Sequence, residues 1–144
     1  MAANSDPIFS KAGAIGLAGG TGIGTSLVTD YDGTGANNVI VFTSDATNGG
    51  FIQRLRLKAK GANATAAVAR VYINNGSVNT SAANNSFYGE IGLPIVAAST
   101  TASTPDVDYP MGFAIPAGYR IVIGVSSSGA LGTGWSVTTI AGAY

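Results

Sequence analysis

The sequence predicts an all-β protein, a single β-sandwich of the jelly-roll or a related Greek-key type with about eight strands and an extended N-terminal arm. Ile and Val number 23 against 6 Leu, and β-branched side chains lose rotamer freedom in helices but pack well on sheets. The 21 Gly fit many turns, and the 23 Ala do not recur at helical spacing. The 144 residues include 34 Ile, Val, Leu and Phe, enough for the core of one domain.

The N-terminal part of the chain is rich in Gly and Ala, with apolar residues scattered over residues 8–29. This composition predicts an extended arm or loop over residues 1–22 and a first strand near residues 23–29. The β-sandwich domain is therefore expected over residues 23–144, without an internal domain boundary. The arm folds either onto a neighbouring subunit or within its own subunit, and both alternatives remain open.

Two strands are expected in the middle of the chain. Residues 38–43 form a continuous apolar run, which indicates a strand buried on both faces. Residues 51–60 alternate between apolar and basic side chains, which predicts a strand with one buried and one outward face. The apolar positions are Leu55, Leu57 and Ala59, and the basic positions are Arg54, Arg56, Lys58 and Lys60.

The remaining strands follow at short intervals. Residues 66–73 form a strand that ends at the sequence Asn-Asn-Gly-Ser of residues 74–77, because Asn and Gly tolerate positive φ at low cost. A polar loop follows, and Pro94 then marks the end or edge of the next strand. The side chains of that strand that share one face are Phe87, Ile91, Leu93 and Ile95. Three further strands are expected over residues 107–115, 119–125 and 135–140.

Charge and cysteine content exclude several function classes. Seven acidic and seven basic residues give a net charge of zero, which leaves little long-range field to attract nucleic acid or an acidic membrane. Without Cys the chain has neither a disulfide scaffold nor a thiolate metal site. No segment is long enough to span a bilayer and no signal peptide is recognisable, which predicts a soluble protein made in the cytoplasm. So few charges indicate that the 37 Ser, Thr and Asn cover the surface, that other subunits bury much of it, or both.

Two Gly-containing segments resemble ligand-binding loops only in part. The run from Gly19 to Thr25 lacks the Lys of a phosphate-binding loop, and a flexible loop is the favoured interpretation. Residues 30–35, Asp-Tyr-Asp-Gly-Thr-Gly, match the opening of a calcium loop, but Val41 stands where the bidentate Glu belongs. A turn is therefore favoured over a metal site at residues 30–35.

Asp106 and Asp108 would share one face of a strand, where general acid–base chemistry can use a carboxylate pair. No His, Cys or Lys accompanies them in the sequence, so solvated groups at a turn or edge are the favoured interpretation. The sequence predicts no catalytic residue, no cofactor and no metal site.

The strongest candidate for a binding site is the row of basic residues Arg54, Arg56, Lys58 and Lys60, here called the basic ladder. Four of the seven positive charges lie on one face of one expected strand, and solvent, neighbouring carboxylates or an acidic partner must relieve their repulsion. An outward solvated stripe is the favoured interpretation, since exposed charges protect strands from unwanted pairing. The alternative is a partner interface, formed by Arg54, Arg56, Lys58 and Lys60.

Several segments of the C-terminal half carry a family resemblance. Residues 73–94 begin with Ile-Asn-Asn and end with Glu-Ile-Gly-Leu-Pro. Residues 111–119 read Met-Gly-Phe-Ala-Ile-Pro-Ala-Gly-Tyr, and residues 134–138 read Gly-Trp-Ser-Val-Thr. This set resembles small structural proteins of tailed bacteriophages, especially β-sandwich decoration or cement proteins of the capsid. The resemblance implies a jelly-roll-like subunit that assembles, commonly as a homotrimer, over junctions between major capsid proteins.

The function predicted from the sequence is that of a non-enzymatic virion structural protein. It is expected on the capsid surface, after synthesis in the host cytoplasm, where it bridges major capsid protein subunits. The alternative is a phage tail, fibre or head-fibre module that binds another virion protein or a host surface glycan.

A third class is a carbohydrate-binding or hydrolytic β-sandwich, which exposed aromatic side chains would favour. The candidate aromatic residues are Trp135, Tyr72, Tyr88, Tyr109 and Tyr119, each of which equally fits a core or interface position. Trp135 and Val137 are expected to be buried together, with Phe113 and Ile121 on inward faces.

Overall fold

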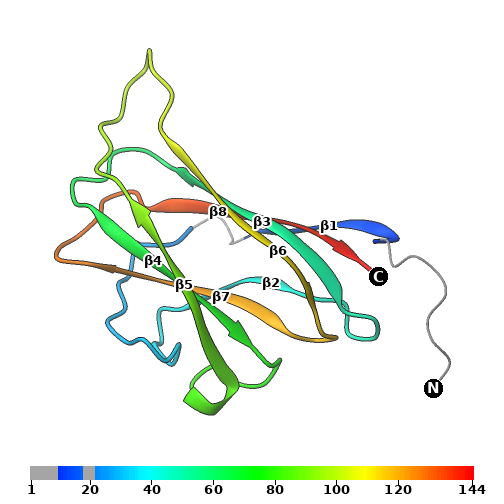
Figure 1. The fold of residues 1–144 in the computed structure, drawn as a ribbon. Coiled ribbons are helices and arrows are strands. Elements are labelled where there is room, and N and C mark those ends of the chain that lie inside the picture. Colours follow the sequence, from blue (N-terminus) through cyan, green and yellow to red (C-terminus); the bar gives the residue numbers. More distant parts are fainter. Residues whose placement is uncertain (1–9, 18–21) are drawn as a thin grey trace, which may run out of the picture.

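The computed structural model describes residues 10–17 and 22–144. They form eight strands in two antiparallel sheets, packed as a sandwich (Figure 1), so the predicted all-β fold is confirmed. Seven of the expected strands are present within a few residues of their predicted bounds. The strands are β1 (Ala12–Leu17), β2 (Val39–Thr43), β3 (Gly50–Ala59), β4 (Ala67–Asn74), β5 (Asn85–Leu93), β6 (Asp106–Ile115), β7 (Arg120–Ser127) and β8 (Trp135–Ala143), with a short 3-10 helix, η1 (Ala82–Asn84), before β5.

The strand order is that of a jelly roll. One sheet, here called sheet A, has the order β1-β8-β3-β6, and the other, sheet B, has the order β2-β7-β4-β5. Two interleaved Greek keys of eight strands produce this order. The edge strands are therefore β1 and β6 in sheet A and β2 and β5 in sheet B.

The core lies between the sheets and consists of the inward side chains of both. Trp135, Val137 and Ile121 are buried there, as predicted. Phe113 is only partly buried but packs against this core. It lies on edge strand β6, where its ring is 5.3 Å from the ring of Tyr88 on β5.

The strand predicted near residues 23–29 is wrong. This segment contributes only an isolated bridge between Ile23 and Trp135, and the first strand is β1, inside the segment predicted as an arm. Close packing requires Gly at position 16 of β1, since a Cβ there would lie 2.1 Å from the Val41 carbonyl oxygen. Residues 1–9 and 18–21 of the expected arm lie outside the described residues, and so do residues 19–21 of the Gly-rich run at 19–25.

Two strands differ from the prediction because of β-bulges. Strand β2 is an edge strand with Ile40 exposed, not a strand buried on both faces, and a bulge between Ile40 and Phe42 turns both Val41 and Phe42 inward. In β5 a register shift opposite Val71 and Tyr72 removes Phe87 from the face that Ile91 and Leu93 share. Ile95, after the end of β5, is also exposed. A bulge inserts one residue and so reverses the alternation beyond it.

The outer face of sheet B is covered by the chain itself. Arg70 and Tyr72 alternate with inward residues of β4, yet both are buried. Residues 24–38, here called the covering segment, pack over them, and Val28 donates its backbone N–H to the Val125 carbonyl. Within this segment Val28 is itself buried.

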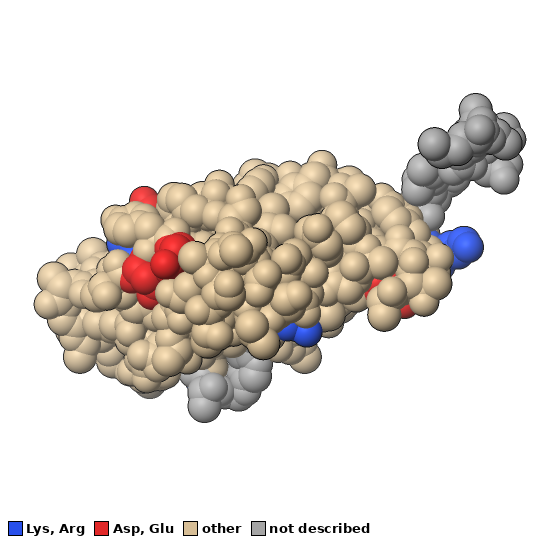
Figure 2. All heavy atoms as spheres, turned by 90° about the horizontal axis from the view of Figure 1, so that it is seen from below, with Lys and Arg blue, Asp and Glu red and all other residues tan. Residues whose placement is uncertain are grey.

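The space-filling view of Figure 2 shows that most of the surface on the side it presents is uncharged.

Candidate partner-binding face

The outer face of sheet A, here called the basic face, carries the basic ladder. On β3 the side chains of Leu55, Leu57 and Ala59 are buried in the core. The alternating cations Arg54, Arg56 and Lys58 therefore point away from it, as predicted. Lys60 lies just beyond the end of β3, with an exposed side chain and a backbone N–H that bonds to the Gly134 carbonyl.

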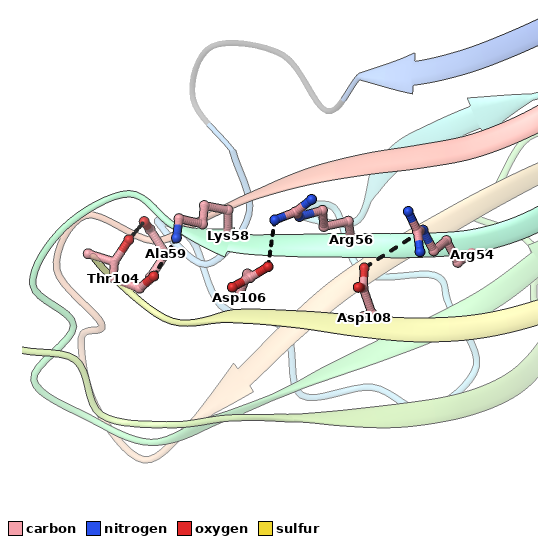
Figure 3. Close-up of polar contacts among 7 residues, drawn as sticks. All are labelled: Arg54, Arg56, Lys58, Ala59, Thr104, Asp106 and Asp108. Atoms are coloured by element: carbon pink, nitrogen blue, oxygen red, sulfur yellow. Dashed lines mark hydrogen bonds and ion pairs between the residues drawn. The ribbon is translucent and has the colours of Figure 1, made fainter. Parts of the chain in front are cut away.

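Two carboxylates of the neighbouring strand β6 pair with the ladder (Figure 3). Arg56 Nη2 lies 2.6 Å from Asp106 Oδ2, and Arg54 Nε lies 3.9 Å from Asp108 Oδ1. Arg56 stands opposite Asp108 in the strand register, so its guanidinium reaches a diagonal neighbour. Neighbouring carboxylates thus relieve part of the repulsion, and the expected position of the two aspartates on a strand edge is confirmed.

Lys58 is held by a different group. Its Nζ donates to the Thr104 carbonyl, and the Thr104 hydroxyl donates to the Ala59 carbonyl at 2.8 Å. Figure 3 shows Lys58, Arg56 and Arg54 in a row along β3. Arg56 and Lys58 are thus held by hydrogen bonds, whereas Arg54 Nε makes only the longer ion-pair contact with Asp108.

The ion pairs of the basic face contribute little to stability. Their side chains are between 40% and 49% exposed, and such pairs are each worth about 0–1 kcal/mol. Among the described residues of β3 and β6 on this face, the three cations Arg54, Arg56 and Lys58 stand beside the two carboxylates Asp106 and Asp108, which gives an excess of positive charge. An apolar border adjoins it, because Ile15 on β1 pairs with Ile140 on β8, which pairs with Arg54.

The segment that resembles a calcium loop forms a turn. Asp32 Oδ1 accepts hydrogen bonds from the hydroxyl and the backbone N–H of Thr34, at 2.7 and 3.0 Å. These bonds lower the pKa of Asp32 below its usual value. The Asp30 carbonyl accepts bonds from Arg70 and from the Tyr72 hydroxyl. Among residues 10–17 and 22–144, no group of three or more His, Cys, Asp or Glu is placed to hold a metal ion.

A buried charge on the other sheet was not predicted. Arg70 is held by Glu90 at 3.2 Å and by the Asp30 carbonyl at 2.9 Å, and its guanidinium lies 3.6 Å from the ring centre of Tyr31. Burial and the Asp30 carboxylate raise the pKa of Tyr72 to about 12. The alternation of β4 places Arg70 and Tyr72 on the outer side of sheet B, and that alternation was the available signal.

The aromatic candidates for glycan binding differ in the exposure of their side chains. Trp135 and Tyr72 are fully buried and cannot contact a ligand at the surface. Tyr109 and Tyr119 are partly buried against the core, and Tyr88 is exposed. The sequence did not single out Tyr31, which is exposed and lies edge-on to Phe87, with 5.8 Å between ring centres.

Two hollows on the described surface have no titratable group in their walls. One hollow of about 370 Å³ is lined by residues 24, 25, 27 and 127–132, and another of about 210 Å³ by residues 22–26 and 36–39. Gly, Ser, Thr, Asn and aliphatic residues form their walls. Within the described residues, no helix has the length and apolar character needed to cross a membrane.

Comparison with known proteins gives one structural likeness. No protein-family model matches the chain, and no curated protein does. The solved structure of infectious bursal disease virus, Gx strain, aligns with 98% of this chain at 17% sequence identity and a TM-score of 0.43. This chain spans 36% of the length of that chain. A likeness of this degree identifies neither a family nor a function.

Proposed function

We propose that this protein is a non-enzymatic structural component of a bacteriophage particle, which binds the outside of the capsid and stabilises it by bridging major capsid protein subunits. The basic face would be the contact surface. One observation carries the proposal: the outer face of sheet A presents an ordered row of charges, whereas residues 24–38 cover the outer face of sheet B. A partner therefore finds a row of paired, partly exposed charges on the outer face of sheet A, whereas sheet B offers only scattered groups such as Glu90 and Arg120.

The fold and the composition support this role. The eight-stranded jelly roll occurs in viral capsid domains, lectins and cupins, and a fold alone does not choose among them. The resemblance of the C-terminal half to capsid decoration proteins favours the first class. The low charged fraction, 10% of residues, favours a subunit whose surface other subunits partly bury.

The pattern of the basic face indicates the chemistry of its partner. Charged rows on the two proteins fix the register of a contact and speed the encounter more than they add affinity. Because the cations are in excess, the complementary surface on the major capsid protein would be acidic. The apolar border formed by Ile15 and Ile140 would pack against uncharged residues beside it.

The proposal is tested by reversing the charges that face the partner. We expect Arg54→Glu combined with Arg56→Glu to abolish co-sedimentation with capsids that lack the protein. Binding of the natural protein should weaken as salt rises, since the screening length is about 8 Å at physiological ionic strength. Arg120→Glu, which reverses a cation on β7 of sheet B, is the control and should bind normally. Unchanged capsid occupancy and salt response in the double variant would refute this role for the ladder.

A second candidate function is that of a tail, fibre or head-fibre module that binds another virion protein or a host surface glycan. The exposed pair Tyr31 and Phe87 favours it, because Arg70 holds the Tyr31 ring from one side and sugars stack on fixed aromatic rings. In that case Tyr31→Ser should abolish binding to purified host-surface polysaccharide, and the ladder reversal should not. No binding of the natural protein to that polysaccharide would exclude the glycan form of this candidate.

A further inference from the structure

The chain contains two Asn-Gly pairs, and both lie in loops between strands. Asn48 and Gly49 are in the turn that joins β2 to β3, and Asn75 and Gly76 are in the loop that follows β4. Because Gly has no Cβ to shield its nitrogen, an Asn-Gly pair is where a backbone nitrogen most readily attacks the preceding side-chain amide. Both asparagines are exposed, and both glycines have positive φ, 74° for Gly49 and 92° for Gly76. Exposure and glycine conformation therefore do not distinguish the two pairs.

The side chain of Asn75 is held at both ends. Its Nδ2 donates to Asn84 Oδ1 at 3.2 Å, and its Oδ1 accepts the backbone N–H of Ser77 at 3.1 Å. The backbone N–H of Gly76 is directed to another acceptor, Asn74 Oδ1, at 2.9 Å. The carboxamide carbon of Asn75 must leave these contacts before the Gly76 nitrogen can reach it, so the folded structure protects this pair.

The side chain of Asn48 is not held in this way. Within residues 10–17 and 22–144, its carboxamide makes no hydrogen bond. The turn is ordered instead by Asp45, whose Oδ1 accepts the backbone N–H groups of Thr47 and Asn48 at 2.9 and 2.7 Å. Gly49 donates its N–H to the Asp45 carbonyl at 3.2 Å, a longer bond than that of Gly76. The main chain is thus fixed, while the Asn48 carboxamide can turn towards the Gly49 nitrogen.

We propose that Asn48 is a site of spontaneous covalent modification, at which the Gly49 backbone nitrogen displaces the side-chain amide as ammonia. The nitrogen loses its proton to hydroxide and attacks Asn48 Cγ, so that a C–N bond forms and closes a succinimide ring. The bond from Cγ to the amide nitrogen breaks, and the leaving group takes up a proton from water. Water then opens the succinimide at either carbonyl, which gives an aspartyl or an isoaspartyl residue.

The modification would change a closely packed turn. Either product adds a negative charge beside Asp45, and the isoaspartyl product inserts an extra carbon into the main chain before Gly49. A Cβ at Gly49 would lie 2.4 Å from the Ile115 carbonyl oxygen, and Gly118 donates its N–H to the Asp45 carbonyl at 3.1 Å. The site therefore lies where the β2–β3 turn meets the β6–β7 turn. The inference is independent of the proposed function.

Peptide mass spectrometry of the purified protein, incubated at mildly alkaline pH, measures the conversion of both asparagines in one sample. We expect Asn48 to react at least about tenfold faster than Asn75, a ratio that corresponds to about 1.4 kcal/mol, roughly the net value of one to two hydrogen bonds. In protein unfolded in urea the two Asn-Gly pairs should react at similar rates, because the protecting contacts are gone. Asn75 is thus the matched control within the same chain.

Two variants test the cause of the difference. Asn84→Ala removes the acceptor of Asn75 Nδ2 and should speed the conversion of Asn75 but not of Asn48. Asn48→Gln should leave no fast site, because the longer side chain closes a larger ring more slowly. The comparison with urea needs no variant and decides the question if Asn84→Ala fails to fold. Equal rates in the folded protein, or a faster reaction at Asn75, would overturn the inference. So would a difference that persists in urea, because local sequence and not the folded contacts would then cause it.

Discussion

Each outer face of the sandwich carries an ion pair between an arginine and a carboxylate, but the two arginines differ in exposure. On sheet B, Arg70 pairs with Glu90, but its side chain is only 7% exposed because the covering segment lies over it. On sheet A, Arg56 pairs with Asp106, and its side chain is 48% exposed. An arginine that the chain encloses organises the fold, whereas one that the chain leaves open remains available to another molecule. Burial, and not residue type, therefore separates a structural ion pair from a candidate binding group.

The largest expected difference in the free energy of unfolding is between the variants that remove Arg70 and Arg56. Arg70→Ala should lower the free energy of unfolding by about 3 kcal/mol, because it leaves Glu90 without its ion-pair partner, removes the charged donor of the part-buried Asp30 carbonyl and removes the support of Tyr31. Arg56→Ala should cost about 0.5 kcal/mol, as for other exposed pairs. Urea denaturation of both variants measures these values. Equal losses would contradict the distinction between the faces.

The covering segment can be tested through its buried anchor. Val28→Ala removes two methyl groups from the contact with sheet B and should cost about 1.5–2 kcal/mol, at about 0.8 kcal/mol for each buried carbon. The exposed Val78→Ala should change the free energy of unfolding by less than about 0.5 kcal/mol. Thermal or urea unfolding distinguishes the two. A negligible effect at Val28 would mean that residues 24–38 do not hold the outer face of sheet B.

The hydroxyl of Tyr72 gives a pH-dependent test of the same cover. Its pKa is raised from 10.0 to about 12 in the folded protein, so the folded state keeps a proton that the unfolded state loses between these values. The resulting stability is complete below pH 10 and is lost as pH rises to 12. Tyr72→Phe should cost about 1 kcal/mol at neutral pH, and its disadvantage should shrink above pH 10. A difference between the two proteins that is constant from pH 8 to 12 would contradict the burial of this hydroxyl.

The charge reversal of the basic face is expected to have only a small effect on stability. Arg54→Glu with Arg56→Glu places four carboxylates together on β3 and β6, yet exposure limits the cost to about 1 kcal/mol in total. Thermal unfolding at low and high salt measures it, and the loss should be smaller at high salt. A loss of several kcal/mol in the free energy of unfolding would mean that the ladder stabilises the fold, and would contradict its role as a partner-binding surface.

The sequence predicted most strands because their patterns are local. The alternation of Leu55 and Leu57 with cations identified β3 and the direction of its ladder, and the Pro-Ala-Gly turn before Arg120 separated β6 from β7. The pairing of Arg56 with Asp106 was not predictable from spacing, since the two residues are 50 positions apart and meet only through the strand register. Strand β1 was missed because Gly and Ala at a close sheet edge have the same composition as a flexible arm.

The features with the least local signal were the bulges and the covering segment. A bulge in β2 or β5 adds one residue and reverses the alternation, and nothing in the run Val-Ile-Val-Phe marks its position. Residues 24–38 lie outside the strands, and their packing on sheet B depends on Gly124, where a Cβ would lie 2.5 Å from a methyl group of Val28. Such contacts depend on residues far apart in the sequence, and one sequence alone does not reveal them.

The central claim is that the basic face contacts the capsid. Chemical modification of arginine in the free and the capsid-bound protein tests it most directly. The chain has four arginines: Arg54 and Arg56 on the basic face, Arg120 on sheet B, and the buried Arg70. Treatment with phenylglyoxal followed by mass spectrometry should show that capsid binding protects Arg54 and Arg56 while the reactivity of Arg120 does not change. Arg70 should stay unreactive in both states. Protection of Arg120 with undiminished modification of Arg54 and Arg56 would contradict the account and assign the contact to sheet B.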